Sequence, residues 1–179
     1  MIFERSKIYD VITMTPETIE DSRGTFFEVF REKELSSYIG QDIKFVQDNQ
    51  SVSNLHVLRG LHYQEKSPQA KLIRVVQGEI FDVAVDLRKN SPDFGKWVGH
   101  YLSEDNRKQV FIPKGFAHGF LSLSDQSSVV YKVNDYYYPY DQKTILWNDK
   151  TLNIEWPCST IPILSEKDKC GSAFDTIQF

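Results

Sequence analysis

The chain of 179 residues has only two cysteines and no long apolar run. Cys158 and Cys170 are not at a metal-ligand spacing, and free thiols in a reducing compartment are a better interpretation than a disulfide framework. No stretch approaches the ~20 apolar residues of a membrane span. Charges at Glu4 and Arg5 come too early for a signal peptide. We therefore expect a soluble, cytoplasmic protein with no membrane association.

Further absences exclude classes of ligand. The net charge of -4 argues against a nucleic-acid partner, because nucleic-acid-binding proteins normally show a clustered basic excess. There is no glycine-rich phosphate loop, so side chains and aromatic stacking would have to hold any nucleotide. His56, His62, His100 and His118 form neither a His-x-His nor a His-x-x-x-His pair. Because metal ligands need such spacings, we expect no metal site.

The chain does contain many short segments rich in β-branched and aromatic residues, separated by turns. Its length predicts one domain over residues 1–179. A short helix is predicted over Arg31–Ile39, ended by Gly40. Thr25–Phe30 is aromatic and β-branched and follows a turn at Asp21-Ser22-Arg23-Gly24. Strands are predicted over Phe45–Gln50, Val57–Gln64, Lys71–Val76, Ile80–Leu87, Trp97–Leu102, Gln109–Ile112, His118–Leu123 and Ser128–Asn134. Such a series of strands indicates an antiparallel sandwich or jelly roll.

Two of these strands flank a turn at Gln77-Gly78-Glu79, which predicts a hairpin of Lys71–Val76 with Ile80–Leu87. Successive side chains of a strand point to opposite faces. One face of the second strand therefore carries the apolar residues Phe81, Val83, Val85 and Leu87, and the other carries Asp82 and Asp86.

The segment Val57–Gln64 carries the first candidate for chemistry, His62. A lone histidine in a strand is more often a hydrogen-bonded structural residue than a catalytic base. However, an unperturbed imidazole titrates near neutrality, where a general base works best. Strict alternation puts His62 and Arg59 on opposite faces. If both line one pocket, Gly60 should mark a bulge or a bend.

Asp168 and Lys71 each allow two interpretations. Asp168 is a candidate to orient His62. The sequence Ser165-Glu166-Lys167-Asp168 also resembles a helix capping box, which spacing alone favours. Lys71 is a candidate to stabilise an enolate oxygen, although a solvated lysine at the start of a strand is commoner.

Four further residues are weaker candidates. Tyr131 is either a proton donor or ordinary packing with its hydroxyl at the rim. His118 follows the turn at Pro113-Lys114-Gly115, a setting that suits a residue entering a pocket. Arg23 and Arg59 are candidate partners for a diphosphate through bidentate contacts, and each alone is more often a surface arginine.

Taken together, the sequence resembles the dTDP-4-dehydrorhamnose 3,5-epimerase family, in that family's order and over nearly the whole chain. No single motif carries the resemblance. The segments that carry it are Asp21–Glu28, Phe45–Asn49, Val57–Gln64, Val75–Arg88, Ile112–Phe120, Tyr131–Pro139, Trp147–Asp149 and Leu164–Asp168. The resemblance implies an all-β, double-stranded β-helix (a cupin-like jelly roll) with a few short helices, a homodimer and no cofactor.

The resemblance also implies a role for each candidate. His62 matches the base that removes protons from C3 and C5 of the sugar, and Asp168 matches its dyad partner. Lys71 matches the lysine facing the 4-keto oxygen, and Tyr131 matches the acid on the opposite face. Contacts with the sugar nucleotide are implied for Arg23, Arg59, His118 and Lys167, and contacts with the nucleoside for Glu28, Gln47 and Asn49. Phe26 and Tyr137 match rings that stack near the base. Gln142 stands where a glutamate is common in the family.

The expected activity is therefore epimerisation of a nucleotide-linked 4-keto-6-deoxy sugar. In the family, the neighbouring subunit contributes the segment bearing Arg23 and Phe26, which implies strand exchange in the N-terminal part. Rival interpretations are an enzyme that inverts only C3 or only C5, or one that uses a GDP-linked sugar or a heptose. A rival from another class is a cupin-like sugar-binding module without activity. Retention of His62, Lys71, Tyr131 and Asp168 argues against that module, because binding requires no base and acid.

Overall fold

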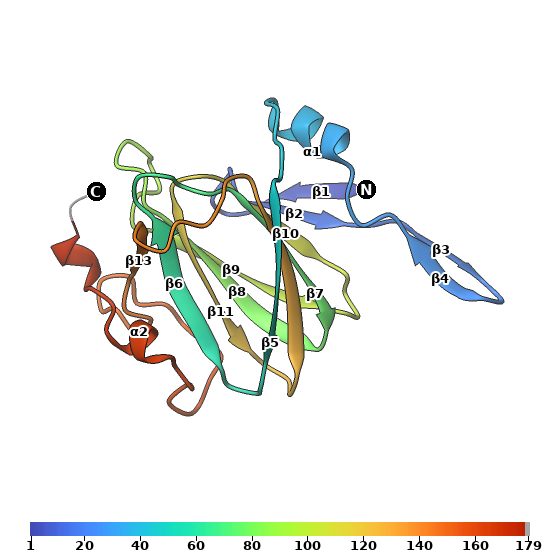
Figure 1. Cartoon of the computed structure of the whole chain (residues 1–179). Coiled ribbons are helices and arrows are strands. Elements are labelled where there is room, and N and C mark those ends of the chain that lie inside the picture. Colours follow the sequence, from blue (N-terminus) through green and yellow to red (C-terminus); the bar gives the residue numbers. More distant parts are fainter. Residues whose placement is uncertain (178–179) are drawn as a thin grey trace.

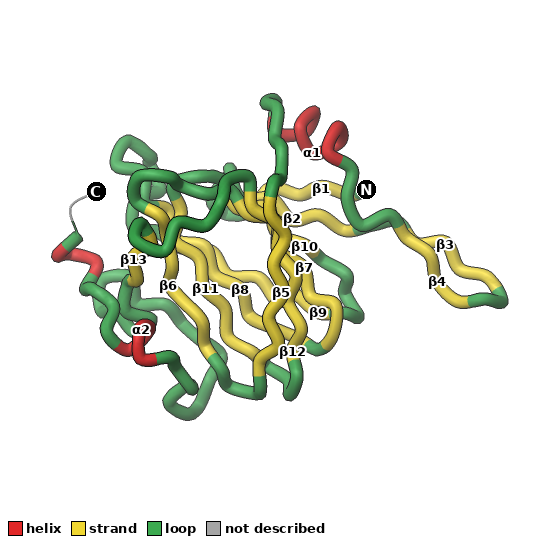
Figure 2. The backbone as a smooth tube through the Cα atoms, in the orientation of Figure 1, coloured by secondary structure: helices red, strands yellow, loops and turns green. Residues whose placement is uncertain are grey.

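The computed structural model describes residues 1–177, which form two antiparallel β-sheets packed face to face (Figures 1 and 2). The six-stranded sheet has the order β1-β2-β10-β7-β12-β5 and the five-stranded sheet the order β13-β6-β11-β8-β9. The strands of the first sheet are β1 (Ile2–Arg5), β2 (Ile12–Thr15), β10 (Gln109–Ile112), β7 (Lys71–Gln77), β12 (Ser127–Val133) and β5 (Gln47–Ser53). Those of the second are β13 (Gln142–Thr144), β6 (Leu58–Gln64), β11 (Phe116–Ser122), β8 (Glu79–Asp86) and β9 (Trp97–Ser103). This arrangement is the predicted all-β jelly roll.

Helices are few and short, as predicted. The helix α1 (Glu32–Ile39) lies beside the six-stranded sheet, and Gly40 ends it in a left-handed conformation with φ +74°. The C-terminal part holds α2 (Glu166–Lys169) and a 3-10 helix at Phe174–Thr176. Among the residues that the structure describes, no helix is both long and apolar enough to span a membrane.

Three apolar clusters hold the layers together. The first lies between the sheets and joins Ile73 and Val75 of β7 to Ile80 and Ala84 of β8. The second lies on the outer face of the five-stranded sheet, where the C-terminal segment covers β8 and β11. The third lies under α1, on the outer face of the six-stranded sheet. β8 contributes Ile80 and Ala84 to the first cluster from one face, and Phe81, Val83 and Val85 to the second cluster from the other.

The predicted hairpin of β7 with β8 is wrong. β7 lies between β10 and β12 in one sheet, whereas β8 lies between β11 and β9 in the other. The turn at Gly78, with φ +77°, is therefore a corner between the sheets. The apolar faces of β7 and β8 meet across the first cluster, and this packing decides the partners of both strands. The predicted strand over Phe45–Gln50 also shifts, because β5 begins at Gln47 and ends at Ser53.

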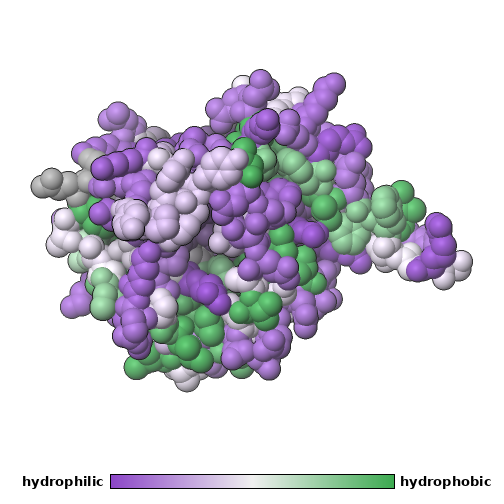
Figure 3. Space-filling view, in the orientation of Figure 1, coloured by the Kyte–Doolittle hydropathy of each residue, from purple (hydrophilic) through white to green (hydrophobic). Residues whose placement is uncertain are grey.

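The hairpin of β3 (Thr18–Asp21) and β4 (Gly24–Phe27) belongs to neither sheet. It projects away from the body of the molecule (Figure 1), and it is apolar near the body and polar at its tip (Figure 3). Ile19 and Phe26 are 65% and 70% exposed. An isolated two-stranded hairpin is marginally stable in water.

The predicted irregularity at Gly60 is confirmed. His118 of β11 pairs with His62 of β6, and Phe120 of β11 pairs with Arg59 of β6. The same stretch therefore spans one more residue in β6 than in β11, which is a β-bulge. Gly60 has φ +121°, and a Cβ atom there would lie 2.6 Å from the Gly119 Cα atom. A Cβ at Gly119 would in turn lie 2.8 Å from the Arg59 carbonyl oxygen. Both positions therefore require glycine.

We expect Gly60→Ala to lower the free energy of unfolding by about 3 kcal/mol, since it adds a positive-φ penalty and a steric clash. Gly40→Ala is a matched control, because Gly40 has φ +74° but no atom within 4 Å of the added carbon. It should cost only about 1 kcal/mol. Urea denaturation of both variants measures the difference, and equal losses would contradict the close contact of β6 with β11.

Candidate active site

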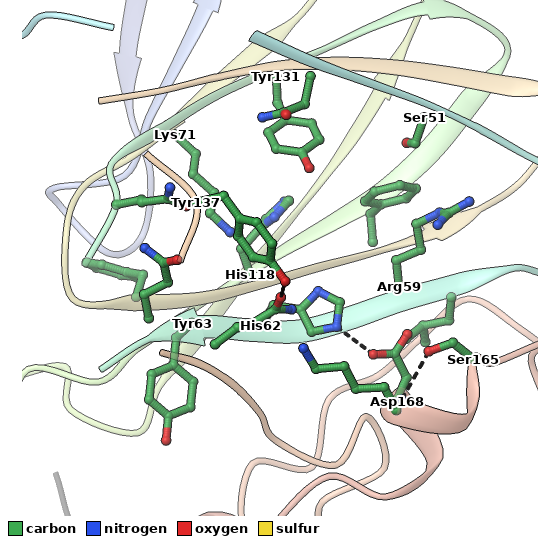
Figure 4. A pocket seen from close by; sticks show the side chains of 18 of the residues that line it. Ser51, Arg59, His62, Tyr63, Lys71, His118, Tyr131, Tyr137, Ser165 and Asp168 are labelled. Carbon is green, nitrogen blue, oxygen red and sulfur yellow. Dashed lines mark hydrogen bonds and ion pairs between the residues drawn. The ribbon is translucent and has the colours of Figure 1, made fainter. Parts of the chain in front are cut away.

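A pocket of about 870 Å³ opens between the two sheets, beside the first apolar cluster. Side chains of β5, β7 and β12 line one wall, and side chains of β6 and β11 line the other (Figure 4). The segments around Tyr137 and Asp168 complete the rim. Of the site residues predicted from the sequence, the pocket brings together Gln47, Asn49, Arg59, His62, Lys71, His118, Tyr131, Tyr137, Gln142, Lys167 and Asp168.

The bulge at Gly60 determines which side chains of β6 reach the pocket. Without it, alternation would turn Arg59 and His62 to opposite faces. With it, both line the pocket. Arg59 is held in place by its neighbours on β5, because its Nε donates to the Ser53 hydroxyl at 3.0 Å and its guanidinium also reaches the Val52 carbonyl at 3.3 Å.

His62 and Asp168 form a close pair. The His62 Nε2 atom lies 2.5 Å from Asp168 Oδ1, and Asp168 is buried. The other imidazole nitrogen lies on the pocket side (Figure 4). Burial alone would raise the pKa of Asp168, but hydrogen bonds with His62, Ser165 and the Gly60 backbone outweigh it and lower that pKa. An ionised carboxylate at Nε2 leaves Nδ1 of a neutral His62 as the proton acceptor.

Asp168 also takes part in the helix cap that its spacing predicts. Its backbone N–H donates to the Ser165 hydroxyl at 3.1 Å, at the start of α2. The cap uses the backbone of Asp168, whereas the contact with His62 uses its side chain. The two interpretations are therefore compatible, and the cap fixes the direction in which the carboxylate points.

A second carboxylate–histidine pair lies on the neighbouring strands. His118 of β11 is directly opposite His62 of β6 in the sheet. The His118 Nε2 atom lies 2.6 Å from Asp82 Oδ2, and both side chains are almost fully buried. Burial lowers the pKa of His118, and Asp82 offsets only part of this effect.

Lys71 projects into the same space from β7, in the opposite sheet. Burial lowers its pKa from 10.5 to about 8, against the opposing pull of the Asp82 carboxylate. Within the described residues, its ammonium group has no hydrogen-bond partner. A desolvated ammonium group without a partner interacts strongly with negative charge that develops beside it.

Tyr131 lies on β12, so it faces His62 from the opposite sheet (Figure 4). Burial raises the pKa of its hydroxyl, and the Arg59 guanidinium offsets part of that rise. The hydroxyl therefore stays protonated at neutral pH. Its position across the pocket from His62 places a proton donor and a proton acceptor on opposite walls.

Hydrogen bonds link the side chains at the outer part of the pocket. The Gln47 amide donates to Asn49 Oδ1 at 2.9 Å, and the Tyr137 backbone N–H donates to Gln47 Oε1 at 3.2 Å. The Tyr137 hydroxyl donates to Gln142 Oε1 at 2.6 Å. These contacts hold the Tyr137 ring over the pocket (Figure 4). An exposed ring between amide groups is suited to stack on a nucleobase and to bond its edge.

Three predicted binding residues lie away from this pocket. Arg23 is at the tip of the β3–β4 hairpin, with its side chain 88% exposed and paired with Asp21. Phe26 lies on the same hairpin, and Glu28 follows it in an ion pair with Arg31. None of the three lines the pocket of its own chain.

Asp82 is the main site residue that the sequence did not identify. The alternation of β8 placed it on the polar face, but the spacing showed no connection with His118. A buried carboxylate almost always has a partner, and this rule is the signal that points to such a pair. Within the described residues, no cluster of three or more histidine, cysteine or acidic side chains is arranged to hold a metal ion.

Comparison with known proteins adds an independent result. The family model described as dTDP-4-dehydrorhamnose 3,5-epimerase matches residues 5–176. A protein of that name from Shigella flexneri is 52% identical over 171 residues, which cover 95% of this chain and 94% of the relative. The crystal structure of a dTDP-6-deoxy-D-glucose-3,5-epimerase from Legionella pneumophila in complex with dTDP-4-keto-L-rhamnose has a TM-score of 0.95 and 44% identity, over 99% of this chain and 94% of that one.

A relative with a different named specificity has a similar structure. The 3'-monoepimerase ChmJ from Streptomyces bikiniensis, in complex with dTDP-quinovose, is 32% identical with a TM-score of 0.90. The match covers 96% of this chain and 87% of ChmJ. Enzymes with one and with two named positions of inversion therefore share this architecture.

Proposed function

The chain belongs to the dTDP-4-dehydrorhamnose 3,5-epimerase family, and from that premise we propose that its pocket inverts C3 and C5 of dTDP-4-dehydro-6-deoxy-D-glucose, giving dTDP-4-dehydro-L-rhamnose. One observation supports this most strongly: His62, with its carboxylate partner, faces Tyr131 across the pocket, and Lys71 lines the same pocket. Inversion next to a ketone needs a base on one face, an acid on the other and a cation near the carbonyl oxygen.

In this mechanism, His62 Nδ1 removes the proton next to the 4-keto group, and the Lys71 ammonium stabilises the enolate oxygen. The Tyr131 hydroxyl then delivers a proton to the opposite face of the same carbon. A positioned donor at the oxyanion contributes about 3–4 kcal/mol. General base catalysis adds roughly 10²–10⁴-fold. Each step is enolisation followed by protonation, so the chemistry requires no redox cofactor.

The same arrangement supports roles for the binding residues. Arg59 and Lys167 supply positive charge at the pocket, and a diphosphate is the group of a nucleotide sugar that such charges attract. Gln47, Asn49 and Tyr137 are suited to the nucleoside. His118 faces the sugar from beside His62.

We further propose that the active unit is a homodimer in which the β3–β4 hairpin of one protomer completes the pocket of its partner. The hairpin projects from the body and exposes Ile19 and Phe26. Arg23 is too far from its own pocket to line it. Exchange of the hairpin would cover the apolar side chains and bring Arg23 to the diphosphate.

The first test is solvent exchange into dTDP-4-dehydro-6-deoxy-D-glucose, followed by NMR in D₂O. Wild-type protein should incorporate deuterium at C3 and at C5, and the configuration of the product at each carbon distinguishes double from single inversion. We expect His62→Ala to abolish exchange at both carbons, because one base serves both. Exchange at either carbon within tenfold of the wild-type rate would exclude His62 as the base.

Tyr131→Phe should separate exchange from inversion. The substitution keeps the ring and its packing and removes only the hydroxyl. His62 can still remove and return a proton on its own face, so deuterium should continue to enter the substrate. Epimerised product should fall by at least about tenfold, in the range of general acid catalysis. Equal loss of exchange and inversion would make Tyr131 a residue that shapes the pocket.

The shared pocket can be tested by mixing two inactive variants, Arg23→Ala and His62→Ala. In a mixed dimer, the protomer that retains His62 receives an intact Arg23 from its partner, so one of the two pockets is complete. Because random exchange makes half of the dimers mixed, activity should return to about a quarter of the wild-type value. The control is a mixture of His62→Ala with Lys71→Ala, which lie in the same pocket and should restore nothing. No recovery in the first mixture would exclude a shared site.

A further inference from the structure

The most unusual group in the interior is the Asp82 carboxylate. Asp82 lies on β8, faces the space between the sheets and is 1% exposed. Its Oδ2 atom is bonded to His118 Nε2, but within the described residues Oδ1 has no hydrogen-bond partner. A buried carboxylate oxygen without a partner is costly.

Every ionisable neighbour of this carboxylate comes from a different strand. His118 lies on β11, Lys71 on β7 and His100 on β9, where it is paired with Asp82 in the sheet. The His100 Nε2 atom is 2.9 Å from the Ser6 hydroxyl, so His100 has a partner of its own. Farther into the pocket are His62 on β6, whose charge acts on His118, and Tyr131 on β12. Lys71 has no hydrogen bond within the described residues, and the charge of Asp82 acts on it against the effect of burial.

We propose that Asp82 is a positioning residue of the epimerase, which fixes His118 through its Nε2 atom and keeps Lys71 in the ammonium form beside the substrate carbonyl. Asp82 acts through these two side chains and does not touch the substrate. The site would then use two carboxylate–histidine pairs: Asp168 with the base His62, and Asp82 with His118 beside Lys71. This inference rests on the proposed function.

Two opposing influences on the pKa of Lys71 determine how the loss of the Asp82 charge would change that pKa. Burial lowers the pKa of Lys71 to about 8, and the charge of Asp82 raises it. Removing that charge leaves burial unopposed, so the pKa must fall further. The ammonium form is present below its pKa and is lost as the pH rises through it. The loss of activity on the alkaline side must therefore move to lower pH.

The variant Asp82→Asn tests this, because it keeps the shape of the side chain and removes its charge. We expect the alkaline limb of kcat to move down by about one pH unit, and kcat above that limb to fall about tenfold. KM should change much less, since the oxyanion develops mainly in the transition state. An alkaline limb that stays in place would overturn the proposal.

Asp86→Asn is the matched control. Asp86 lies on the same strand and the same face and is equally buried, but its carboxylate is paired with Arg88. Its loss should lower the thermal midpoint of unfolding without moving the alkaline limb. An equal shift in both variants would mean that general destabilisation, rather than the charge beside Lys71, is responsible, and would also overturn the proposal.

Two NMR measurements test the inference without relying on activity. In lysine-labelled protein without substrate, the Lys71 titration should occur at lower pH in Asp82→Asn than in wild type, and an unchanged titration refutes the proposal. In histidine-labelled wild-type protein at pH 8, His118 should carry its proton on Nε2 and not on Nδ1. The opposite tautomer refutes the proposal even if the variant does not fold. If these results agree while the wild type shows no epimerisation, the proposed function fails and the link between Asp82 and Lys71 stands.

Discussion

The close approach of β6 to β11 is the constraint on which the rest of the site depends. Gly60 and Gly119 bring the two backbones so near that neither position has room for a Cβ atom. The extra residue that β6 accommodates there reverses the alternation of its side chains. Arg59 and His62 consequently share one pocket, and the Gly60 backbone lies against the Asp168 carboxylate. A regular strand would have placed His62 and Arg59 on different faces.

The charges of the site are distributed so that each histidine has a fixed partner. His62 and His118 are opposite one another across adjacent strands, and each binds a buried carboxylate through Nε2. The carboxylates of Asp168 and Asp82 hold both rings in one orientation, and the Asp82 charge offsets part of the effect of burial on Lys71. The electrostatics and the geometry of the pocket therefore have the same origin.

Much of this could be predicted from residue patterns, and the failures have identifiable physical causes. Alternation in Ile80–Leu87 correctly gave the two faces of β8, and Gly60 correctly indicated a bulge. The turn at Gly78 was misleading, because a local turn does not reveal whether the strands it joins pair or face each other across a core. The contacts of Asp168 and Asp82 were beyond spacing arguments, since residues 106 and 36 positions apart form those pairs. The position of Arg23 outside its own pocket depends on how the hairpin projects, which the pattern of its residues does not determine.

The space between the sheets serves as both core and active site, and this dual use explains why the pocket contains unsatisfied groups. At one end, apolar side chains of β7, β8 and β11 fill the space. At the other, the Lys71 ammonium, the Tyr131 hydroxyl and one oxygen of Asp82 have no hydrogen-bond partner within the described residues. Each such group costs stability when it is buried. The apolar packing beside them and on both outer sheet faces offsets that cost. A rigid sandwich can thus hold these groups apart from one another, where they can act on a substrate.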